Sequence, residues 1–477
     1  MNKRKNHRPM SVITMGCRVN QFETELLRHG GHKRGFYIAK EGDKSELIIV
    51  NTCSVTSESD RQARQAIRRA AKDNPEAKIV ITGCYAQRTP EILSKLPQVA
   101  LVLGNQEKND LWSHVDRLFA SHSDNNGEQT AVIDNIIDGG VGHSIIHVGD
   151  IAKLEKVPPR PVVDSFSDRA RAFLQLQDGC NRSCTYCLIP GVRGPSRSLT
   201  PEQILAQAEG FVVAGYNELV LTGIDLGSYG QDFSPKISLA DIIKKLIEIP
   251  GLGRVRLSSI DPLDIDSQLI DLIGSEEKIC PYLHLSIQSG DNMILKRMGR
   301  RADRNRIIKQ INKVKQVRPN IILGADLIVG FPTESDEAFQ NSLTLVEETQ
   351  LVYLHIFRYS DRPGTPASAI PGSFRSSGVT IKERSEILRK AGEQNLTNVA
   401  KNMLGQRQKV LIETLKDGVG IGKTASFMTV SFPLNGDEVV GKITDIIIDK
   451  FDIENRCLKG TVQELSTALS TKTVDKM

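Results

Sequence analysis

The sequence FLQLQDGCNRSCTYC, residues 173–187, places three cysteines directly behind a short apolar run. The run at residues 173–177 is typical of a buried β-strand, and Cys180, Cys184 and Cys187, the second triad of this chain, follow it. Three thiolates at this spacing fit one iron–sulfur cluster, whose Cys ligands typically number four. Because the motif supplies only three, one iron would be open to a small-molecule ligand. A zinc site, which needs four closed ligands, and a disulfide with a spare thiol are the alternatives.

The chain around this motif alternates apolar runs with amphipathic stretches, which predicts strands followed by helices. The predicted strands are residues 173–177, 218–222, 254–258, 282–287, 323–329 and 351–357. The predicted helices are residues 201–214, 239–249, 266–273, 304–317, 334–348 and 382–403. Six such units make an open or partial parallel barrel, whose active site is expected at the C-terminal ends of the strands.

Three more cysteines occupy corresponding positions upstream. Residues 11–14, 47–51 and 78–82 are predicted strands, and a helix over residues 60–75 makes the last two a parallel βαβ unit. Cys17, Cys53 and Cys84, the first triad, each lie at or just behind the end of one of these strands. Neighbouring parallel strands are about 4.8 Å apart, so three such thiols can converge on a second cluster at one sheet edge. The alternative is that buried cysteines merely favour strand ends.

The rest of the chain limits the class of protein. Residues 405–465 alternate apolar and polar positions, which predicts a small antiparallel barrel or sandwich of the kind often used to hold nucleic acid. The 477 residues carry 62 Lys and Arg against 57 Asp and Glu, a balance too mild to prove or exclude a nucleic-acid partner. No apolar run approaches the roughly 18 residues of a membrane helix, and the start lacks a secretory pattern. We therefore expect no membrane partner and a cytoplasmic location.

The spacing CxxxCxxC, with the aromatic Tyr186 before the last cysteine, resembles the radical S-adenosylmethionine (radical SAM) enzymes. In that superfamily the open iron binds the amino and carboxylate groups of SAM, and an electron from the cluster cleaves SAM to a 5′-deoxyadenosyl radical. The resemblance implies that Gly223 leaves room for the methionyl group, that Gly330, Phe331 and Pro332 present backbone to the adenine, and that Tyr186 belongs to the cofactor site. Four later motifs at predicted strand ends support it: residues 221–225, 284–291, 325–334 and 357–367.

The two triads together with the C-terminal β module resemble the methylthiotransferases over roughly residues 10–465. The resemblance implies an α/β fold in three domains. These are a flavodoxin-like N-terminal parallel sheet at residues 10–150, a radical SAM partial (β/α)6 barrel at residues 166–400, and a small TRAM-like RNA-binding β-barrel at residues 403–467. The stretches MGCRVNQFETE (residues 15–25), NTCSVT (51–56) and TGCYAQ (82–87) look like the MtaB-type enzymes, which act on N6-threonylcarbamoyladenosine beside the tRNA anticodon.

What the resemblance implies for mechanism is specific. One SAM would donate a methyl group to sulfur at the first triad, a second would be cleaved at the second triad, and the radical would abstract hydrogen from carbon 2 of the adenine. The implied cofactors are two 4Fe–4S clusters and SAM, and the implied partners are tRNA, a low-potential electron donor and a sulfur donor. Arg193 and Arg197, just behind the second triad, are candidates for RNA contacts. His284 is expected to be a hydrogen-bonded core histidine.

Three alternatives stay open. The same chemistry could act on isopentenyl-adenosine in tRNA or on a ribosomal-protein side chain, but those branches tend to read GCQMN and GCPKN where this chain reads GCRVN. A non-catalytic, metal-containing RNA-binding protein would use its cysteines structurally. Against it, each triad lacks the fourth ligand of a closed site.

Overall fold

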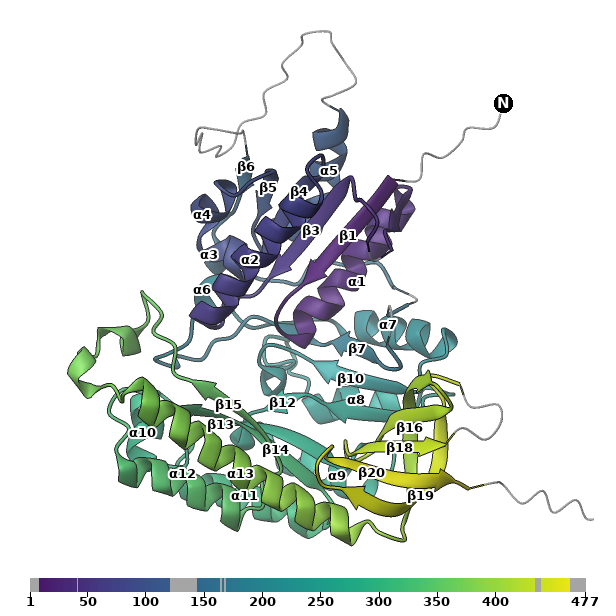
Figure 1. The fold of residues 1–477 in the computed structure, drawn as a ribbon, viewed down its shortest axis with the longest axis vertical. Helices are drawn as coiled ribbons and strands as arrows, with labels where there is room; N and C mark the ends of the chain where they lie inside the picture. Colours follow the sequence, from purple (N-terminus) through teal and green to yellow (C-terminus); the bar gives the residue numbers. More distant parts are fainter. Residues whose placement is uncertain are drawn as a thin grey trace, which may run out of the picture.

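The computed structural model describes residues 8–40, 42–120, 144–163, 165–166, 169–433 and 439–463. Figure 1 shows a parallel sheet flanked by helices (purple to blue), a curved sheet with helices on its outer side (teal to green), and a small β-barrel (yellow) against the side of the curved sheet. Of the helices in these ranges, none is long and apolar enough to cross a membrane. Residues 464–467 of the predicted C-terminal domain lie outside them.

The N-terminal part is a parallel sheet with the strand order β2-β1-β3-β4-β5-β6. Its strands are β1 (Arg8–Thr14), β2 (Phe36–Ile38), β3 (Leu47–Thr52), β4 (Lys78–Gly83), β5 (Val99–Leu103) and β6 (Ile145–His147). Its helices are α1 (Arg18–Lys33), α2 (Ser57–Asp73), α3 (Cys84–Arg88), α4 (Pro90–Ser94) and α5 (Leu111–Ala120). The first five strands have the flavodoxin-like order, which confirms the predicted fold.

The central strand β3 is buried along its whole length because helices cover both faces of the sheet. Alternate side chains of a strand point to opposite faces. Accordingly, Ile48 and Val50 enter a core with helix α2, while Leu47 and Ile49 enter a second core with α1 and α5. Helix α2 begins three residues before the predicted start, because the Thr56 side chain accepts a hydrogen bond from a first-turn amide and caps the helix there.

The middle part is the predicted open barrel, formed by two parallel sheets. One sheet contains β7 (Ala172–Gln175), β10 (Glu218–Thr222) and β11 (Arg254–Leu257), and the other contains β12 (Ser259–Ile260), β13 (Tyr282–Gln288), β14 (Ile322–Val329) and β15 (Tyr353–Arg358). The predicted strand at residues 254–258 corresponds to β11 in the first sheet, and the chain passes directly from it into β12 of the second sheet. The long helices are α7 (Pro201–Val213), α8 (Leu239–Ile247), α9 (Ser267–Ser275), α11 (Arg304–Val317), α12 (Asp336–Glu348) and α13 (Gly378–Asn402).

Short elements join these strands at the end where the cysteines lie. They are the antiparallel pair β8 (Gln177–Asp178) and β9 (Arg197–Ser198), and the helices α6 (Ile189–Arg193) and α10 (Asn292–Arg297). The 3-10 helices are η1 (Glu107–Asp110), η2 (Ile151–Lys153), η3 (Leu226–Ser228), η4 (Pro262–Asp264), η5 (Pro366–Ala369) and η6 (Gly372–Phe374).

The C-terminal part is a closed barrel of five strands with the order β16-β17-β18-β20-β19. The strands are β16 (Arg407–Lys416), β17 (Val419–Thr424), β18 (Thr429–Pro433), β19 (Ile443–Asp452) and β20 (Cys457–Val462). The predicted barrel is confirmed, but the prediction that it is antiparallel throughout is wrong, since β18 and β20 pair in parallel. A closed ring with an odd number of strands cannot alternate direction at every step, so one neighbouring pair must be parallel.

This small barrel is packed into the open barrel rather than attached by a flexible tether. Tyr282 and Ile322 of the open barrel share one buried core with Val410 and Phe432 of the small barrel. The Arg254 guanidinium also donates hydrogen bonds of 3.1 Å to two backbone carbonyl oxygens in strands β16 and β17. The small barrel therefore closes one side of the larger one.

Candidate active site

The second triad lies in the loop between β8 and α6, and its three thiols are free. Each sulfur accepts a hydrogen bond from a nitrogen. The donors are the Arg182 amide to Cys180 at 3.4 Å, the Ile189 amide to Cys187 at 3.4 Å, and the Arg300 guanidinium to Cys184 at 3.7 Å. Nitrogen–hydrogen donors directed at sulfur stabilise negative charge there, as hydrogen bonds to cluster sulfurs do.

The loop that carries this triad has little freedom to move. Gly179 has a φ of +73°, and a Cβ on it would lie 1.9 Å from the Pro195 carbonyl oxygen, so another residue would not fit. Arg182, between the first two cysteines, donates to both carboxylate oxygens of Asp225 at 2.7 and 2.8 Å and pairs with Asp261 at 3.2 Å. The three sulfurs are consequently held in place by the surrounding protein.

The first triad lies at the C-terminal edge of the N-terminal sheet, and its members line one cavity of about 390 Å³. Cys53 and Cys84 are buried, whereas Cys17 is exposed. Gly16, just before Cys17, has a φ of +92°, and a Cβ there would lie 2.7 Å from the Cys53 sulfur. Gly83, just before Cys84, also has a positive φ, of +98°. The glycines therefore let the chain bring the cysteines together.

The charge state of the buried thiols bears on what they can hold. Burial raises the pKa of Cys53 to about 11, and burial together with Asp225 raises that of Cys180 to about 12. At neutral pH such thiols are protonated unless a cation accompanies them, and metals bind thiolates. The cysteine thiols are free and their sulfurs accept hydrogen bonds from N–H groups. They are therefore suited to binding a positively charged group such as iron, which binds cysteine as the thiolate.

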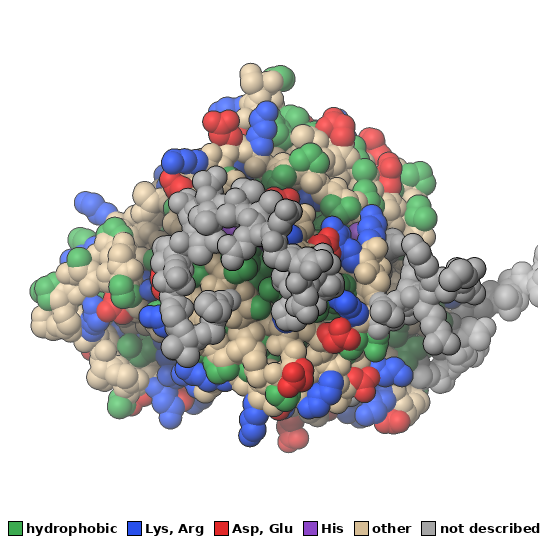
Figure 2. Space-filling model, turned by 90° about the horizontal axis from the view of Figure 1, so that it is seen from above, with side chains coloured by type: hydrophobic (Ala, Val, Ile, Leu, Met, Phe, Trp, Pro, Cys, Tyr) green, Lys and Arg blue, Asp and Glu red, His purple; other side chains and the backbone are tan. Residues whose placement is uncertain are grey.

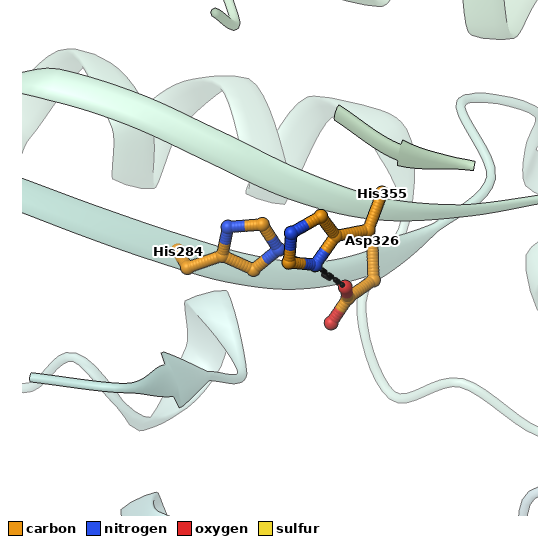
Figure 3. A group of neighbouring side chains, drawn as sticks. All are labelled: His284, Asp326 and His355. Carbon is orange, nitrogen blue, oxygen red and sulfur yellow. Dashed lines mark hydrogen bonds and ion pairs between the residues drawn. The ribbon is translucent and has the colours of Figure 1, made fainter. Parts of the chain in front are cut away.

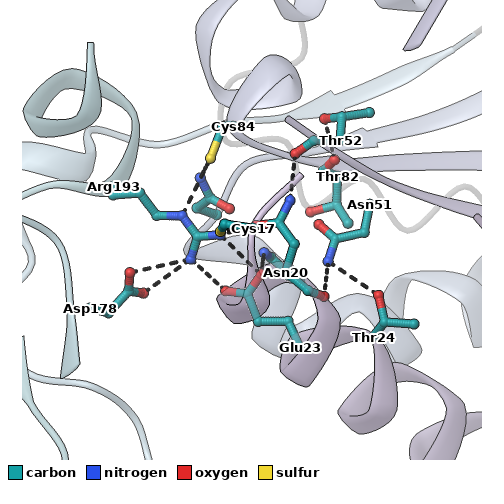
Figure 4. A network of polar contacts seen from close by, with 12 residues as sticks. Cys17, Asn20, Glu23, Thr24, Asn51, Thr52, Thr82, Cys84, Asp178 and Arg193 are labelled. Atoms are coloured by element: carbon teal, nitrogen blue, oxygen red, sulfur yellow. Dashed lines mark hydrogen bonds and ion pairs between the residues drawn. The ribbon is translucent and has the colours of Figure 1, made fainter. Parts of the chain in front are cut away.

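A buried arginine joins the first triad to Asp178, in the segment that leads into the second triad (Figure 4). Arg193 extends from α6 into the N-terminal sheet, and its Nε donates to the Cys84 sulfur at 3.3 Å. Its Nη1 donates to Glu23 at 2.6 Å and to Asp178 at 3.2 Å, and Lys108 pairs with Glu23 from the other side at 2.6 Å. Burial alone would raise the pKa of the Glu23 carboxyl, but the positive charges of Arg193 and Lys108 hold this pKa well below its usual range. The first triad therefore lies beside a buried, fully paired charge network.

This placement corrects the prediction that Arg193 and Arg197 contact RNA. Arg193 is 0% and Arg197 4% exposed, so neither guanidinium can meet a phosphate on the surface. Arg197 donates to the backbone carbonyl of Arg193 at 2.7 Å and lies beside Asp178. Both side chains turn inward because carboxylates of the two domains meet at this position, and a buried carboxylate needs a cation.

Replacing Arg193 with methionine is expected to destabilise the protein by about 3–5 kcal/mol, the usual cost of removing one partner of a buried charge network. Glu23 would keep Lys108, but Asp178 would lose its close guanidinium. For a domain of 150–250 residues this corresponds to a drop of about 10 °C in Tm, measurable by calorimetry of the metal-free protein.

The matched control is Arg34→Met, which removes an exposed ion pair with Asp116 and is expected to cost less than about 1 kcal/mol. Equal Tm values for the two variants would contradict the assignment. A pH series adds a check. Because the folded-state pKa of Glu23 is lowered, its stabilisation is complete above the unfolded pKa of about 4.3 and is lost as the pH falls through the folded-state pKa.

A second buried arginine fixes the other side of the domain contact. Arg362, in the loop behind β15, donates to the Ser54 carbonyl at 3.0 Å and to Asp60 at 2.9 Å. Ser54 directly follows Cys53, so this contact also anchors the first triad. Arg88 reaches the same Asp60 carboxylate at 3.0 Å. Arg193 and Arg362, both from the middle part of the chain, thus bind carboxylates of the N-terminal part at two separate places.

The cavity is where the two halves of the site meet. Beside the first triad it is lined by Tyr186 and Gly223, two of the residues predicted at the cofactor site, and by Asp225. Asp225 accepts the weak 3.7 Å hydrogen bond of the Cys180 thiol, so the second triad lies directly behind this wall. One cavity, partly open to solvent, therefore has thiols of the N-terminal domain on one wall and the surroundings of the second triad on the other.

The turn at residues 330–332, predicted to present backbone to the adenine of SAM, packs beside the cavity. The Gly330 amide donates to the Glu334 carboxylate at 2.8 Å, so this one backbone group is not free for an adenine. Phe331 is 0% exposed and packs in a small core with Tyr186. Pro332 is buried next to it. The turn forms the support behind Tyr186, and none of its three residues lines the cavity.

Several residues of the site were not predicted from the sequence. Arg182 stands inside the cysteine motif itself, where a charged residue between ligands is the one local hint. Asn20 and Glu23 lie in the first and second turns of α1, and Arg193, the partner they share, is about 170 residues away. His284 is 2% exposed and hydrogen-bonded, as expected, yet it contacts Asp326 (Figure 3), which lines the cavity.

Comparison with known proteins agrees with this architecture. The radical SAM superfamily matches residues 174–346, and the uncharacterized protein family UPF0004 matches residues 9–104. Among solved structures, the radical S-adenosylmethionine methyltransferase TsrM from Kitasatospora setae is similar with a TM-score of 0.55 and 13% identity, covering 76% of this chain and 75% of that one. That likeness concerns the fold alone. Fold and cysteine sites together define a radical SAM protein with a second cysteine triad.

Comparison with curated proteins identifies the family within the radical SAM superfamily. Threonylcarbamoyladenosine tRNA methylthiotransferase MtaB of Rickettsia prowazekii is 40% identical over 86% of this chain and 89% of its own length. MtaB of Thermotoga maritima is 36% identical over 84% and 86%. The chain belongs to the MtaB family of methylthiotransferases.

Proposed function

We propose that this protein adds a methylthio group to carbon 2 of N6-threonylcarbamoyladenosine in tRNA. The observation that carries the proposal is the single cavity of about 390 Å³ lined by the first triad and by residues next to the second triad. A sulfur-insertion reaction needs a sulfur source and a means of activating the substrate within reach of one another. The names of the similar proteins, which specify this nucleoside, support the choice of substrate.

The two triads would hold one 4Fe–4S cluster each, with SAM at the open iron of the second. An aromatic C–H bond has no useful acidity, so a protein base cannot activate it, and the cluster with SAM supplies radical chemistry for that step when bound. The protein's task is alignment. Arg182 and Arg300 orient the second triad, and Arg193 places positive charge beside Cys84. Tyr186 and Gly223 line the cavity on the side of the second triad.

The remaining partners follow from this chemistry. Substrate binding would involve the C-terminal barrel together with the surface around the cavity. On the uncovered part of the face shown in Figure 2, basic and acidic side chains are interspersed, so RNA binding there would not rest on one basic patch. A low-potential electron donor must reduce the cluster, and a sulfur donor must renew the sulfur that each turnover consumes.

The test is mass spectrometry of tRNA nucleosides from cells with and without the gene. Loss of 2-methylthio-N6-threonylcarbamoyladenosine, with accumulation of the parent nucleoside, is the expected result. An unchanged nucleoside profile would overturn the proposal and redirect the search to a ribosomal-protein substrate. Restoring the product by the wild-type gene, but not by a Cys53→Ala gene, would connect the loss to this chain.

A further inference from the structure

A second cavity, of about 570 Å³ and partly open to solvent, lies beside the second triad, and we call it the outer pocket. It is lined by Cys184 and by Arg300, whose guanidinium donates to the Cys184 sulfur at 3.7 Å. Cys184 is half-buried, whereas Cys180 is buried. Among the described residues that line the outer pocket there is no member of the first triad. The outer pocket therefore gives access from solvent to one residue of the second triad without passing the first.

The helices next to the outer pocket concentrate positive charge. Residues 292–317 form α10, α11 and the turn between them, and they contain nine Lys and Arg against one acidic residue. The resulting net charge of +8 exceeds the +5 of the whole chain. Four exposed members of this set, which we call the basic rim, are Lys296, Arg297, Arg301 and Arg306. A surface with charge of one sign attracts partners of the opposite sign and speeds their association.

The basic rim is held against the loop that carries the second triad. The Arg297 carbonyl accepts a hydrogen bond of 2.8 Å from the hydroxyl of Thr185, which directly follows Cys184. Arg301 lines the outer pocket, and Arg306 donates to the Arg301 carbonyl at 3.2 Å. A protein bound to the basic rim would therefore lie beside Cys184.

The charges inside the outer pocket are paired with one another. Arg300 pairs with Asp261 at 2.8 Å, Arg301 pairs with Asp264 at 2.5 Å, and Arg182 contacts both carboxylates. The interior therefore has few free charges to offer a small ion. The excess of positive charge lies on the basic rim, where a partner with a large acidic surface can meet it.

We propose that the outer pocket and the basic rim form the docking site for a small acidic protein that delivers one electron to the cluster at the second triad. The inference rests on the proposed function, which requires such a donor, and it identifies where the donor binds. The docked protein loses one electron and the cluster gains it, and no atom passes between the two proteins. Complexes of this kind are small, with less than about 1,200 Å² buried, so a short rim around one pocket suffices.

RNA fits this surface less well than an acidic protein. The adenosine must reach the cavity that both triads share, and the first triad does not line the outer pocket. Figure 1 also shows α10 at one edge of the curved sheet and the small C-terminal barrel, the expected RNA-binding module, at the other. The basic rim is thus left to a partner that needs the second triad alone.

The test compares two reductants on the reconstituted full-length enzyme. Dithionite is a small molecule that needs no docking surface, and a reduced acidic flavodoxin, replaced by an acidic ferredoxin in a parallel series, is the protein probe. In the variant Lys296→Glu with Arg297→Glu, the affinity for the protein probe, measured by titration calorimetry, and SAM cleavage with that probe are each expected to fall on the order of tenfold at low salt. Cleavage with dithionite should stay within about twofold of wild type, since the triad and its donors are intact.

The matched control is Lys244→Glu with Lys245→Glu. Both pairs of residues are exposed and lie in the last turn of a helix, so the two variants change charge equally and at the same kind of position. Helix α8, which carries Lys244 and Lys245, has no residue on either cavity. The control should bind and use the protein probe as the wild type does. Raising the ionic strength from about 0.1 M to about 1 M shortens the Debye length from about 10 Å to about 3 Å and should weaken binding by the wild type far more than by the rim variant.

Equal affinities of the rim variant and the wild type for the protein probe would overturn the docking site, as would an equal loss in the control. A wild type that binds neither acidic probe would also overturn it. A rim variant that loses affinity for an anticodon stem-loop RNA, but not for the protein probe, would show that RNA occupies the surface instead. An enzyme that cleaves SAM with dithionite but forms no methylthio product on RNA would refute the proposed function and leave the docking site standing.

Discussion

Replacing Cys184 with alanine is expected to abolish SAM cleavage while iron at the first triad remains. Loss of an outer-shell partner typically costs about 10–100-fold in metal affinity or activity, so loss of one of three ligands should exceed that. The fold should survive, because the Cys184 backbone keeps its contact with the Cys187 amide and Arg300 keeps its 2.8 Å pair with Asp261. The measurement is 5′-deoxyadenosine formed under strong reductant, with iron counted per chain.

The matched control is Cys457→Ala, which removes a thiol in the small barrel that contacts only a backbone carbonyl among the hydrogen bonds of the described chain. It should keep both the iron content and the cleavage rate of the wild type. The variant Cys184→Ala should lose about half of the iron, since two clusters are proposed. Continued cleavage of SAM by that variant would show that the second triad is not the radical centre.

The two triads were predictable because each depends on a short-range rule. The second triad is defined by spacing within eight residues, and the first by the position of each cysteine at the end of a parallel strand. The folded chain places Cys17, Cys53 and Cys84 on one cavity as strand geometry requires. Local rules of this kind need no knowledge of which domain faces which.

The role of Arg193 could not be predicted, because it depends on contacts between residues that are far apart in the sequence. The sequence around it looks like a basic surface turn, and its carboxylate partner Glu23 is 170 residues away. Whether an arginine meets water or a buried carboxylate depends on how two domains dock, which no local pattern encodes.

One strand of the small barrel was hard to predict because it is rich in glycine. Strand β17, with the sequence VGIGKT, has a weak strand pattern, because glycine has a low strand propensity. The structure explains both glycines by close packing. A Cβ on Gly422 would lie 2.2 Å from the Leu411 carbonyl oxygen, and one on Gly420 would lie 2.5 Å from the Phe432 ring. Counting this fifth strand is what makes the parallel pair in the ring unavoidable.

Replacing Cys53 with alanine should have the opposite effect to the change at Cys184. SAM cleavage should stay within about twofold of wild type, because the second triad and its donors belong to the other domain, and distant independent sites behave additively. The methylthio product should be undetectable, since the first triad could no longer hold the group that supplies sulfur. Alanine keeps the Cβ that packs against Gly16, so only the sulfur is lost.

The comparison with Cys280→Ala separates loss of a ligand from loss of a buried thiol. Cys280 is 1% exposed, so its replacement disturbs packing about as much as the change at Cys53, but it lies outside the cavity. Cys280→Ala should therefore retain both SAM cleavage and methylthiolation of RNA. Product formed by Cys53→Ala would refute the role of the first triad. Loss of SAM cleavage in that variant would instead show that the two sites are coupled through the Arg193 network, since Arg193 contacts both Cys84 and Asp178, two residues before Cys180.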